Sequence, residues 1–265
     1  MFKISMLFLA FMALAGCHSS NRVEMEKIIF LHHSTGQAVW LGSTNRYVYR
    51  LTRKGDVQKY FDRYNRSHKT AYQISDMKFP QALPYGGRNY PYDYYNIWVK
   101  NAGVHPYMEQ PTLEMLTKEY DVIVFKHCFP VGFIQEDTGY PNVDSEEKRL
   151  ENYYLQYGAL KQKMHAFPNN IFIVWTPPAL LKKATTEEQA KRTHDFYQWV
   201  MDEWNEKGDN IHVWDFYGYE TEGDVYMNEA FALGSGDSHP NAGFAAQMAP
   251  LFARFMIDCM EGRVD

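Results

Sequence analysis

The sequence predicts an α/β domain in which helices cover both faces of a parallel β-sheet. Short apolar runs rich in β-branched and aromatic residues occur at 27–31, 121–125, 171–175 and 211–216. Their apolar residues are consecutive instead of alternate, which is typical of strands buried on both faces. Helical patterns lie between and after these runs. Alternation of this kind favours parallel strands connected by helices.

The expected elements follow from local signals. Residues 70–75 form a weaker strand candidate beside the four runs. Helices are expected at 145–165 and 186–206, because a serine or threonine followed by acidic residues is a typical helix start. A third helix is expected at 242–260, where Pro250 must kink it or lie in its first turns.

The N-terminus has the features of an export signal. Lys3 precedes an apolar stretch at 4–15, which is too short for a spanning helix. The stretch closes on Leu-Ala-Gly-Cys at 14–17, which resembles a bacterial lipobox. The resemblance implies a signal peptide at 1–17, lipidation of Cys17 and a polar tether at 18–26. We therefore expect an exported protein that Cys17 anchors to a membrane, at the outer membrane, the cell surface or the periplasmic face.

The 248 residues after the signal (265 minus 17) are long enough for one large domain, which we expect at 27–265. The net charge of the full sequence, −5, argues against a nucleic-acid partner. Aromatic residues reach 16% of the chain, which suits either a tyrosine-rich core or contacts with sugar rings. Cys128 and Cys259 are distant in sequence, and we expect both to be unpaired and buried.

Residues 77–111 are rich in proline, glycine and tyrosine and show no regular period. A loop of this length inside a compact domain is usually functional or disordered, and its aromatic content argues against disorder. We predict a folded insertion near the site. Within it, the stretch at 94–98 is either core packing or a platform for a sugar.

A serine and a histidine at opposite ends of the chain suggest catalysis. Ser34 directly follows the first strand, and His239 precedes the last helix. The carboxyl ends of parallel strands share one edge of a sheet, so topology can bring the two together. A serine hydroxyl becomes a nucleophile when a base accepts its proton. Alternatively, Ser34 lies in an ordinary turn and His239 packs at a helix start.

The layout resembles the SGNH, or GDSL-type, hydrolases. The HPNAGF sequence at 239–244 resembles the closing turn of that family, and 174–180 and 213–217 resemble its fourth and fifth strands. The resemblance spans residues 27–260. It implies a flavodoxin-like three-layer α/β/α sandwich with a five-stranded parallel sheet, and an esterase or deacetylase with Ser34 as nucleophile and His239 as base.

Two departures concern the catalytic residues. His32 and His33 precede Ser34, where the family has glycine and aspartate. The family's acid would fall on Gly236, whereas the aspartate here is Asp237. A side chain at that spacing need not reach the imidazole, so the orienting acid is Asp237, Asp215 or absent.

A third departure concerns the oxyanion. The family's asparagine falls on Cys128 or His127, so one donor is missing. The loss of one such donor typically costs ~10²–10³ in rate. A backbone amide, Lys126 or His127 is the expected substitute. Gly86 and Gly87 are both candidates for the second-block glycine. The full set of further candidates for oxyanion or substrate binding is His33, Gly87, Lys126, His127 and Asp215.

We therefore expect a serine esterase that needs no cofactor and removes acyl groups from a carbohydrate or another small ester. One alternative is a glycan-binding lipoprotein that keeps the fold without turnover. Another is a metal-dependent hydrolase, whose ligands would be His32 or His33, His127, Asp237 and His239.

Overall fold

The computed structural model describes residues 26–264. The expected signal peptide with Cys17, and the expected tether up to residue 25, lie outside the described residues. Among the helices that the structure does describe, none combines the length and the apolar character needed to cross a lipid bilayer.

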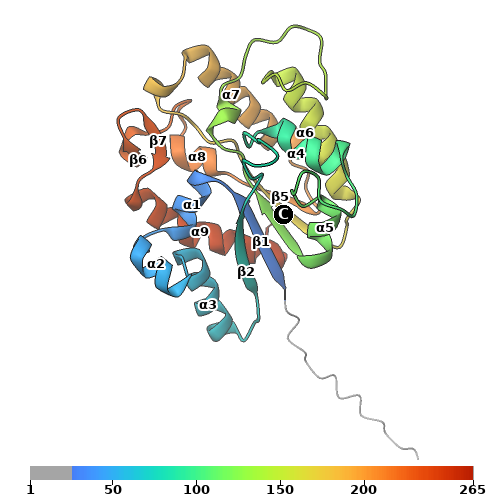
Figure 1. The fold of residues 1–265 in the computed structure, drawn as a ribbon. Coiled ribbons are helices and arrows are strands. Elements are labelled where there is room, and N and C mark those ends of the chain that lie inside the picture. Colours follow the sequence, from blue (N-terminus) through green and yellow to red (C-terminus); the bar gives the residue numbers. More distant parts are fainter. Residues whose placement is uncertain (1–25, 265) are drawn as a thin grey trace, which may run out of the picture.

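The core of the molecule is a five-stranded parallel sheet in the order β2-β1-β3-β4-β5 (Figure 1). This confirms the predicted α/β fold class. All neighbouring strands pair in parallel. The strands are β1 (Lys27–His32), β2 (Gln73–Lys78), β3 (Val122–Phe125), β4 (Ile171–Trp175) and β5 (Ile211–Trp214).

Helices cover both faces of the sheet, and successive strand residues enter two separate cores. In β1, Ile28 and Phe30 join one core, and Ile29 and Leu31 join the other. This is why the strands read as continuous apolar runs. The first core includes residues of α1 (Ser34–Leu41), α3 (Asp56–His68) and α9 (Ala242–Met260), and the second includes residues of α4 (Pro91–Tyr95), α5 (Leu113–Glu119), α6 (Leu150–His165) and α7 (Glu187–Trp199).

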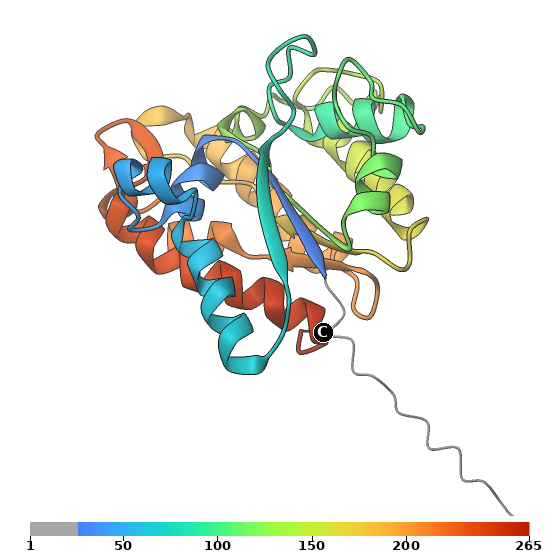
Figure 2. The same cartoon turned by 60° about the horizontal axis from the view of Figure 1, so that its bottom comes forward.

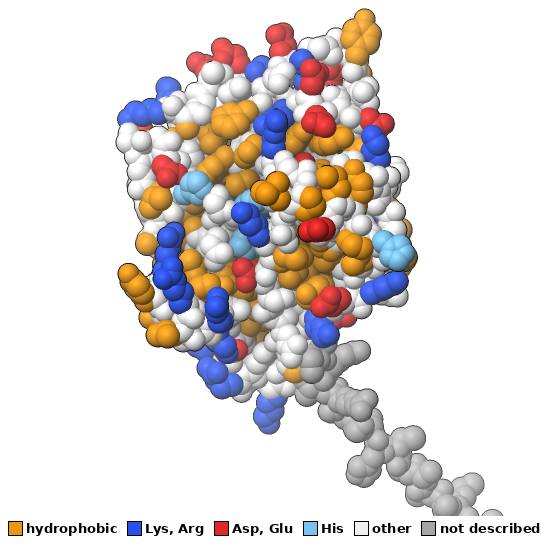
Figure 3. Space-filling view, viewed as in Figure 1, with side chains coloured by type: hydrophobic (Ala, Val, Ile, Leu, Met, Phe, Trp, Pro, Cys, Tyr) orange, Lys and Arg blue, Asp and Glu red, His pale blue; other side chains and the backbone are white. Residues whose placement is uncertain are grey.

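Several elements were not predicted from the sequence. They are the helices α1, α2 (Arg46–Thr52), α3, α4, α5 and α8 (Phe216–Thr221), and a hairpin of β6 (Ala232–Gly234) and β7 (Asp237–Pro240). Short 3-10 turns occur at η2 (Phe129–Gly132), η3 (Lys182–Ala184) and η5 (Glu229–Phe231). Helix α2 buries none of its residues, and Leu51 is 87% exposed. In Figure 3, basic side chains gather over α2 and α3 at the lower left.

Some predicted boundaries were wrong. The strand expected at 70–75 is β2, which begins three residues later, at Gln73. The run at 211–216 ends as a strand at Trp214, because Asp215 caps α8. The helix expected at 186–206 is α7, which continues into a π-helical turn, η4 (Val200–Trp204).

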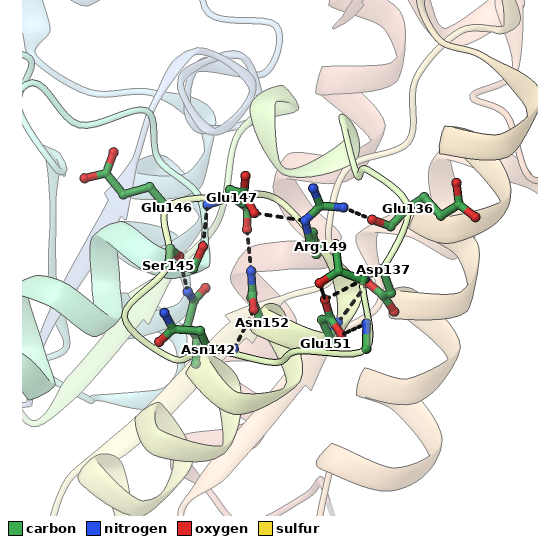
Figure 4. A network of polar contacts seen from close by, with 12 residues as sticks. Glu136, Asp137, Asn142, Ser145, Glu146, Glu147, Arg149, Glu151 and Asn152 are labelled. Atoms are coloured by element: carbon green, nitrogen blue, oxygen red, sulfur yellow. Dashed lines mark hydrogen bonds and ion pairs between the residues drawn. The ribbon is translucent and has the colours of Figure 1, made fainter.

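The helix expected to start at Ser145 begins instead at Leu150. Side chains hold the preceding segment in a loop, as Figure 4 shows. The Ser145 hydroxyl accepts the amide of Glu147 at 3.1 Å, so it stabilises a local turn and not a helix start. Asn152, inside α6, accepts the amide of Asn142 through its side-chain oxygen at 2.8 Å.

The insertion at 77–111 is folded. It contains α4 and a π-helical turn, η1 (Asn96–Lys100). Figure 2 shows the segment after β2 projecting beyond the carboxyl end of that strand. The stretch at 94–98 is core packing and not a sugar platform, because Tyr94, Ile97 and Trp98 are fully buried.

Helix α9 matches the predicted 242–260 and continues through Pro250, which is exposed. The Asn241 side chain caps it by accepting the amide of Phe244 at 2.9 Å. Cys128 and Cys259 are both free and buried, as predicted.

Candidate functional site

Ser34 is the first residue of α1 and is exposed to solvent. β1 ends at His32, and His33 has extended backbone angles before the helix begins. The first intrahelical bond runs from the amide of Gln37 to the carbonyl of His33 at 3.0 Å. The amide of Ser34 therefore has no intrahelical acceptor. The serine hydroxyl and this amide lie together at the positive end of a helix.

A hollow of about 400 Å³ lies beside Ser34, between the ends of β1 and β2. This volume is within the ~300–1,000 Å³ range of small-molecule sites. Beside Ser34, the hollow is lined by His32, His33, Gln37, Asp76 and Lys78. A small ester has room to approach the hydroxyl there.

His239 lies in β7, and Asp237 lies two residues earlier on the same strand. Side chains two residues apart on a strand point to the same face. The Nδ1 of His239 accordingly lies 2.6 Å from the Oδ1 of Asp237. Gly236, at the position where the family has its acid, has a φ of 90° and makes the turn into β7.

The contact with Asp237 determines which nitrogen of His239 is available. A carboxylate only accepts hydrogen bonds, so in the neutral ring Nδ1 carries the hydrogen and Nε2 has the lone pair. The hydrogen bond from His239 lowers the pKa of Asp237, which keeps its carboxylate charged. The pair therefore has the arrangement of a general base and the acid that orients it.

Ser34 and His239 lie on the same side of the molecule. Helix α1 packs against β7. The Ser34 Oγ lies 3.5 Å from the Sγ of Cys128, and the ring of the next residue, Phe129, meets the His239 ring edge-on at 4.7 Å between centroids. Among residues 26–264, the hydrogen-bond partner of the Ser34 hydroxyl is Cys128 and not His239.

His33 and Gly87 link Ser34 to the insertion. The Nε2 of His33 donates to the carbonyl of Pro80 at 2.7 Å. Burial, together with the charge of Lys126, lowers the pKa of His33 to about 4, so the ring is neutral near pH 7. Gly87 packs directly on Pro80, and a Cβ there would lie 2.5 Å from the proline ring. Gly87 thus contacts Pro80, and Pro80 in turn contacts His33, the residue that precedes Ser34.

Lys126 cannot donate directly to a substrate, because its side chain is fully buried. It lies beneath the first turn of α1, where a Cβ on Gly36 would approach the lysine Cδ to 3.0 Å. The Nζ has no hydrogen-bond partner among the described residues. Burial lowers the pKa of Lys126, whereas the nearby Cys128 and Glu220 raise it.

His127 points away from Ser34, so its expected role in oxyanion or metal binding is wrong. Residues 126–128 continue β3 in sequence, and adjacent side chains of an extended chain face opposite sides. The imidazole is fully buried beside the rings of Tyr94, Phe125 and Tyr157. Burial lowers the pKa of His127 to about 3.

Asp215 serves a structural role, which removes it as a candidate for the orienting acid. Its carboxylate caps α8 by accepting the amide of Gly218 at 2.8 Å. It also accepts the hydroxyl of Tyr197 at 3.2 Å. The acid that contacts His239 is Asp237.

The residues proposed as metal ligands do not converge. Within residues 26–264, no three histidine, cysteine, aspartate or glutamate side chains are arranged to hold a metal ion. His32 pairs with Asp76 at 3.2 Å, and His127 lies in the opposite core.

Sequence reasoning missed the roles of Phe129 and Cys128. The sequence predicted that Cys128 is unpaired and buried and stands in place of an asparagine, but its contact with Ser34 was not predicted. The position of Cys128 two residues after Lys126 was the available signal, because that spacing places both on one face.

No protein-family model matches this chain, and no curated protein matches it.

Proposed function

We propose that this protein is a serine ester hydrolase of SGNH type that removes acyl groups from a carbohydrate. The observation that carries the proposal is the exposed Ser34 at the start of α1, beside the hairpin that holds the hydrogen-bonded pair of Asp237 and His239. An accessible hydroxyl, a free imidazole nitrogen and a helix N-terminus are the three parts that acyl transfer needs.

The reaction would proceed in two steps. Ser34 turns from Cys128 toward His239, and its Oγ attacks the ester carbonyl while Nε2 of His239 accepts the proton. The amide of Ser34 donates to the oxyanion. The imidazolium then protonates the departing alcohol, leaving an acyl-serine. Water hydrolyses the acyl group by the same proton transfers in reverse.

The carbohydrate part of the proposal is supported by a second hollow of about 430 Å³ that the insertion builds. Its lining combines aromatic rings with amide and charged side chains, including Tyr85, Arg88, Tyr92, Asn96, Tyr107 and Glu146. Aromatic faces and planar polar groups are suited to a ring that carries hydroxyl groups.

This second hollow is preformed, and a backbone hydrogen bond joins the loop that builds it to Cys128, which contacts Ser34. The buried carboxylate of Asp93 accepts the amides of Arg88 at 2.8 Å and Asn89 at 2.5 Å, which fixes the loop. The carbonyl of Asn89 in turn accepts the amide of Cys128 at 2.9 Å. A glycan in the second hollow would thus lie on the segment that is anchored beside Ser34.

The competing function is glycan binding without turnover. It is favoured by the contact of the Ser34 hydroxyl with Cys128 and by the absence of the family's asparagine. Purified protein should be assayed with p-nitrophenyl acetate, beside Ser34→Ala and the surface control Ser67→Ala. Loss of hydrolysis in Ser34→Ala alone supports the esterase. Activity that is equal in all three proteins would exclude Ser34 as the nucleophile.

We also propose that the chain is exported and anchored at Cys17. Two or more acyl chains hold a protein stably at a membrane where one does not. Cells labelled with a palmitate analogue should incorporate it into the wild-type protein and not into Cys17→Ala. Equal labelling of both proteins would contradict the anchor.

A further inference from the structure

Cys128 occupies an unusual position for a buried thiol. It follows Lys126 by two residues, so both side chains lie on the face of the chain toward α1. Its sulfur lies 3.5 Å from the exposed hydroxyl of Ser34, and the residue itself is 8% exposed. A small reagent that contacts the Ser34 hydroxyl therefore lies next to the Cys128 sulfur.

Several groups around the sulfur favour its negative form. The amide of Thr35, at the start of α1, and the amide of Phe129 both hydrogen-bond to it. These amides have no intrahelical acceptor of their own, and helix starts favour negative charge. The Ser34 hydroxyl adds a third contact.

Lys126 places a fully buried amino group on the same side of the chain as the thiol. Its Nζ has no hydrogen-bond partner among the described residues. Burial lowers the pKa of Lys126, whereas the electrostatic interactions with Cys128 and Glu220 raise it. Glu220 is also fully buried and uses one oxygen to accept the amide of Ala179 at 2.9 Å. A buried ammonium group needs an anion nearby, and a thiolate at Cys128 is one.

The thiol pKa values of the two free cysteines, Cys128 and Cys259, shift in opposite directions. Burial raises the pKa of the Cys128 thiol, but the Lys126 charge and the hydrogen bonds outweigh burial and bring the pKa below its ordinary value. Burial and the charge of Asp258 raise the pKa of the Cys259 thiol to about 12. Thiolates, and not thiols, are the reactive species.

We propose that Cys128 is a reactive thiolate and a site of covalent modification by small electrophiles and hydroperoxides. With iodoacetamide, the thiolate sulfur forms a bond to carbon and iodide departs. With hydrogen peroxide, the sulfur gains one oxygen atom, and protonation of the departing hydroxide gives water and cysteine sulfenic acid. An adduct on the sulfur occupies the space beside Ser34 and blocks substrate there, a consequence that rests on the proposed esterase function.

The test measures alkylation of the native full-length protein in detergent by iodoacetamide between pH 5 and pH 10, with mass spectrometry of the peptides that contain each cysteine. The expected midpoint for Cys128 lies below the ordinary thiol value of about 8.5, and Cys259 stays unmodified. A Cys128 midpoint at or above that value, or a rate no faster than that of Cys259, would overturn the proposal.

A variant pair tests the source of the thiolate. In Lys126→Met with Glu220→Gln, both buried ionisable side chains are replaced by uncharged side chains of similar size, a change that folded proteins commonly tolerate. The Cys128 midpoint should rise by about one pH unit or more, because a nearby cation lowers an acidic pKa by ~1–3 units. An unchanged midpoint would show that Lys126 does not act on the thiol. The wild-type profile decides reactivity even if this variant fails to fold.

Peroxide treatment tests the second step. Dimedone should trap sulfenic acid at Cys128, and dithiothreitol added instead of dimedone should restore ester hydrolysis. Absence of the dimedone adduct would contradict the oxidation step. If the protein hydrolyses no ester at all, alkylation still decides whether Cys128 is reactive, so failure of the esterase proposal and failure of this one are distinguishable.

Discussion

The imidazole of His239 and the carboxylate of Asp237 are hydrogen-bonded at 2.6 Å although only one residue separates them in the chain. The contact exists because β7 extends from Asp237 to Pro240, so both side chains leave the strand on one face. The positive φ of Gly236 allows the strand to begin there. An acid two residues before the histidine can therefore orient the ring.

This contact predicts the effect of Asp237→Asn on catalysis. The amide keeps the shape of the carboxylate but no longer holds the proton on Nδ1 by charge, so Nε2 becomes a weaker base. We expect kcat/KM for p-nitrophenyl acetate to fall by about 10²-fold or more, within the ~10²–10⁴ that proton-transfer catalysis contributes.

Asp215→Asn is the matched control for that measurement. Asp215 caps α8, and asparagine caps a helix about as well as aspartate, so this substitution should cost little stability. We expect thermal stability close to that of the wild type, with kcat/KM unchanged. If Asp215→Asn lost activity and Asp237→Asn did not, the assignment of the orienting acid would be reversed.

The fold was more predictable than the site. The sheet was visible because strands such as Ile171–Trp175 are buried on both faces, and a continuous apolar run records that burial. The helix α1 was not predicted, because its polar start at Ser34 resembles a turn and its large apolar residues, Val39 and Trp40, come only near its end. Local signals also failed at Ser145, where tertiary hydrogen bonds hold a loop.

At the candidate site, the sequence singled out Ser34, His239 and Asp237 as candidates but could not place their neighbours. Which of Lys126 and His127 faces Ser34 depends on the phase of the chain after β3, and one residue of shift exchanges them. Only the structure shows that His127 enters the opposite core, beside Tyr94. Contacts such as that of His33 with the Pro80 carbonyl join distant segments and leave no local pattern.

The second hollow predicts a difference between large and small substrates. Tyr92→Ala removes a half-buried ring from its lining. We expect KM for an acetylated oligosaccharide to rise about tenfold, because a sugar ring would lose its stacking contact with Tyr92. Stacking of a nucleic-acid base on an aromatic side chain, a similar contact, contributes ~1–3 kcal/mol. Kinetics with p-nitrophenyl acetate, which has no sugar ring to occupy this hollow, should be unchanged.

Tyr140→Ala is the control for this prediction, because Tyr140 is 84% exposed and does not line the hollow. Its KM for the oligosaccharide should equal that of the wild type. An equal rise in both variants, or a parallel loss with the small ester, would show that the hollow does not bind the glycan.

Two helical glycines should respond oppositely to alanine. In Gly36→Ala, the new Cβ would lie 2.5 Å from the Cβ of His32 and 3.0 Å from the Cδ of Lys126, so α1 must shift away from β1. We expect destabilisation of about 1–3 kcal/mol, as overpacking typically costs, with loss of ester hydrolysis. Gly158 in α6 has no atom within 4 Å of an added Cβ. Gly158→Ala should stabilise by about 0.5–1 kcal/mol, which urea unfolding measures.

The buried His127 predicts a pH dependence of stability. Its pKa in the folded protein is about 3, below the ordinary value of 6.5, because burial disfavours the charged ring. As pH falls from 6.5 toward 3, the unfolded chain binds a proton that the folded protein does not bind. The free energy of unfolding contributed by this group therefore decreases on acidification, by at most about 1.4 kcal/mol per pH unit.

Other buried groups also make the free energy of unfolding depend on pH. The prediction therefore concerns the difference between a His127 variant and the wild type. His33, with a pKa of about 4, has the same sign as His127. Burial raises the pKa of Glu220 and of Asp93, which makes their contributions opposite in sign. The net slope of the wild type is therefore a sum of four or more terms, and removing one group isolates its share.

His127→Phe keeps a ring beside Tyr94 and Tyr157 and removes two buried nitrogens that have no hydrogen-bond partner among the described residues. We expect a gain of about 1 kcal/mol at pH 7, because an unsatisfied buried polar group costs ~1–3 kcal/mol. Between pH 6 and pH 4, urea unfolding of the variant should lose less stability than the wild type. The exposed His105→Gln should match the wild-type slope. If His127→Phe also matched it, the imidazole would not be held neutral by the fold.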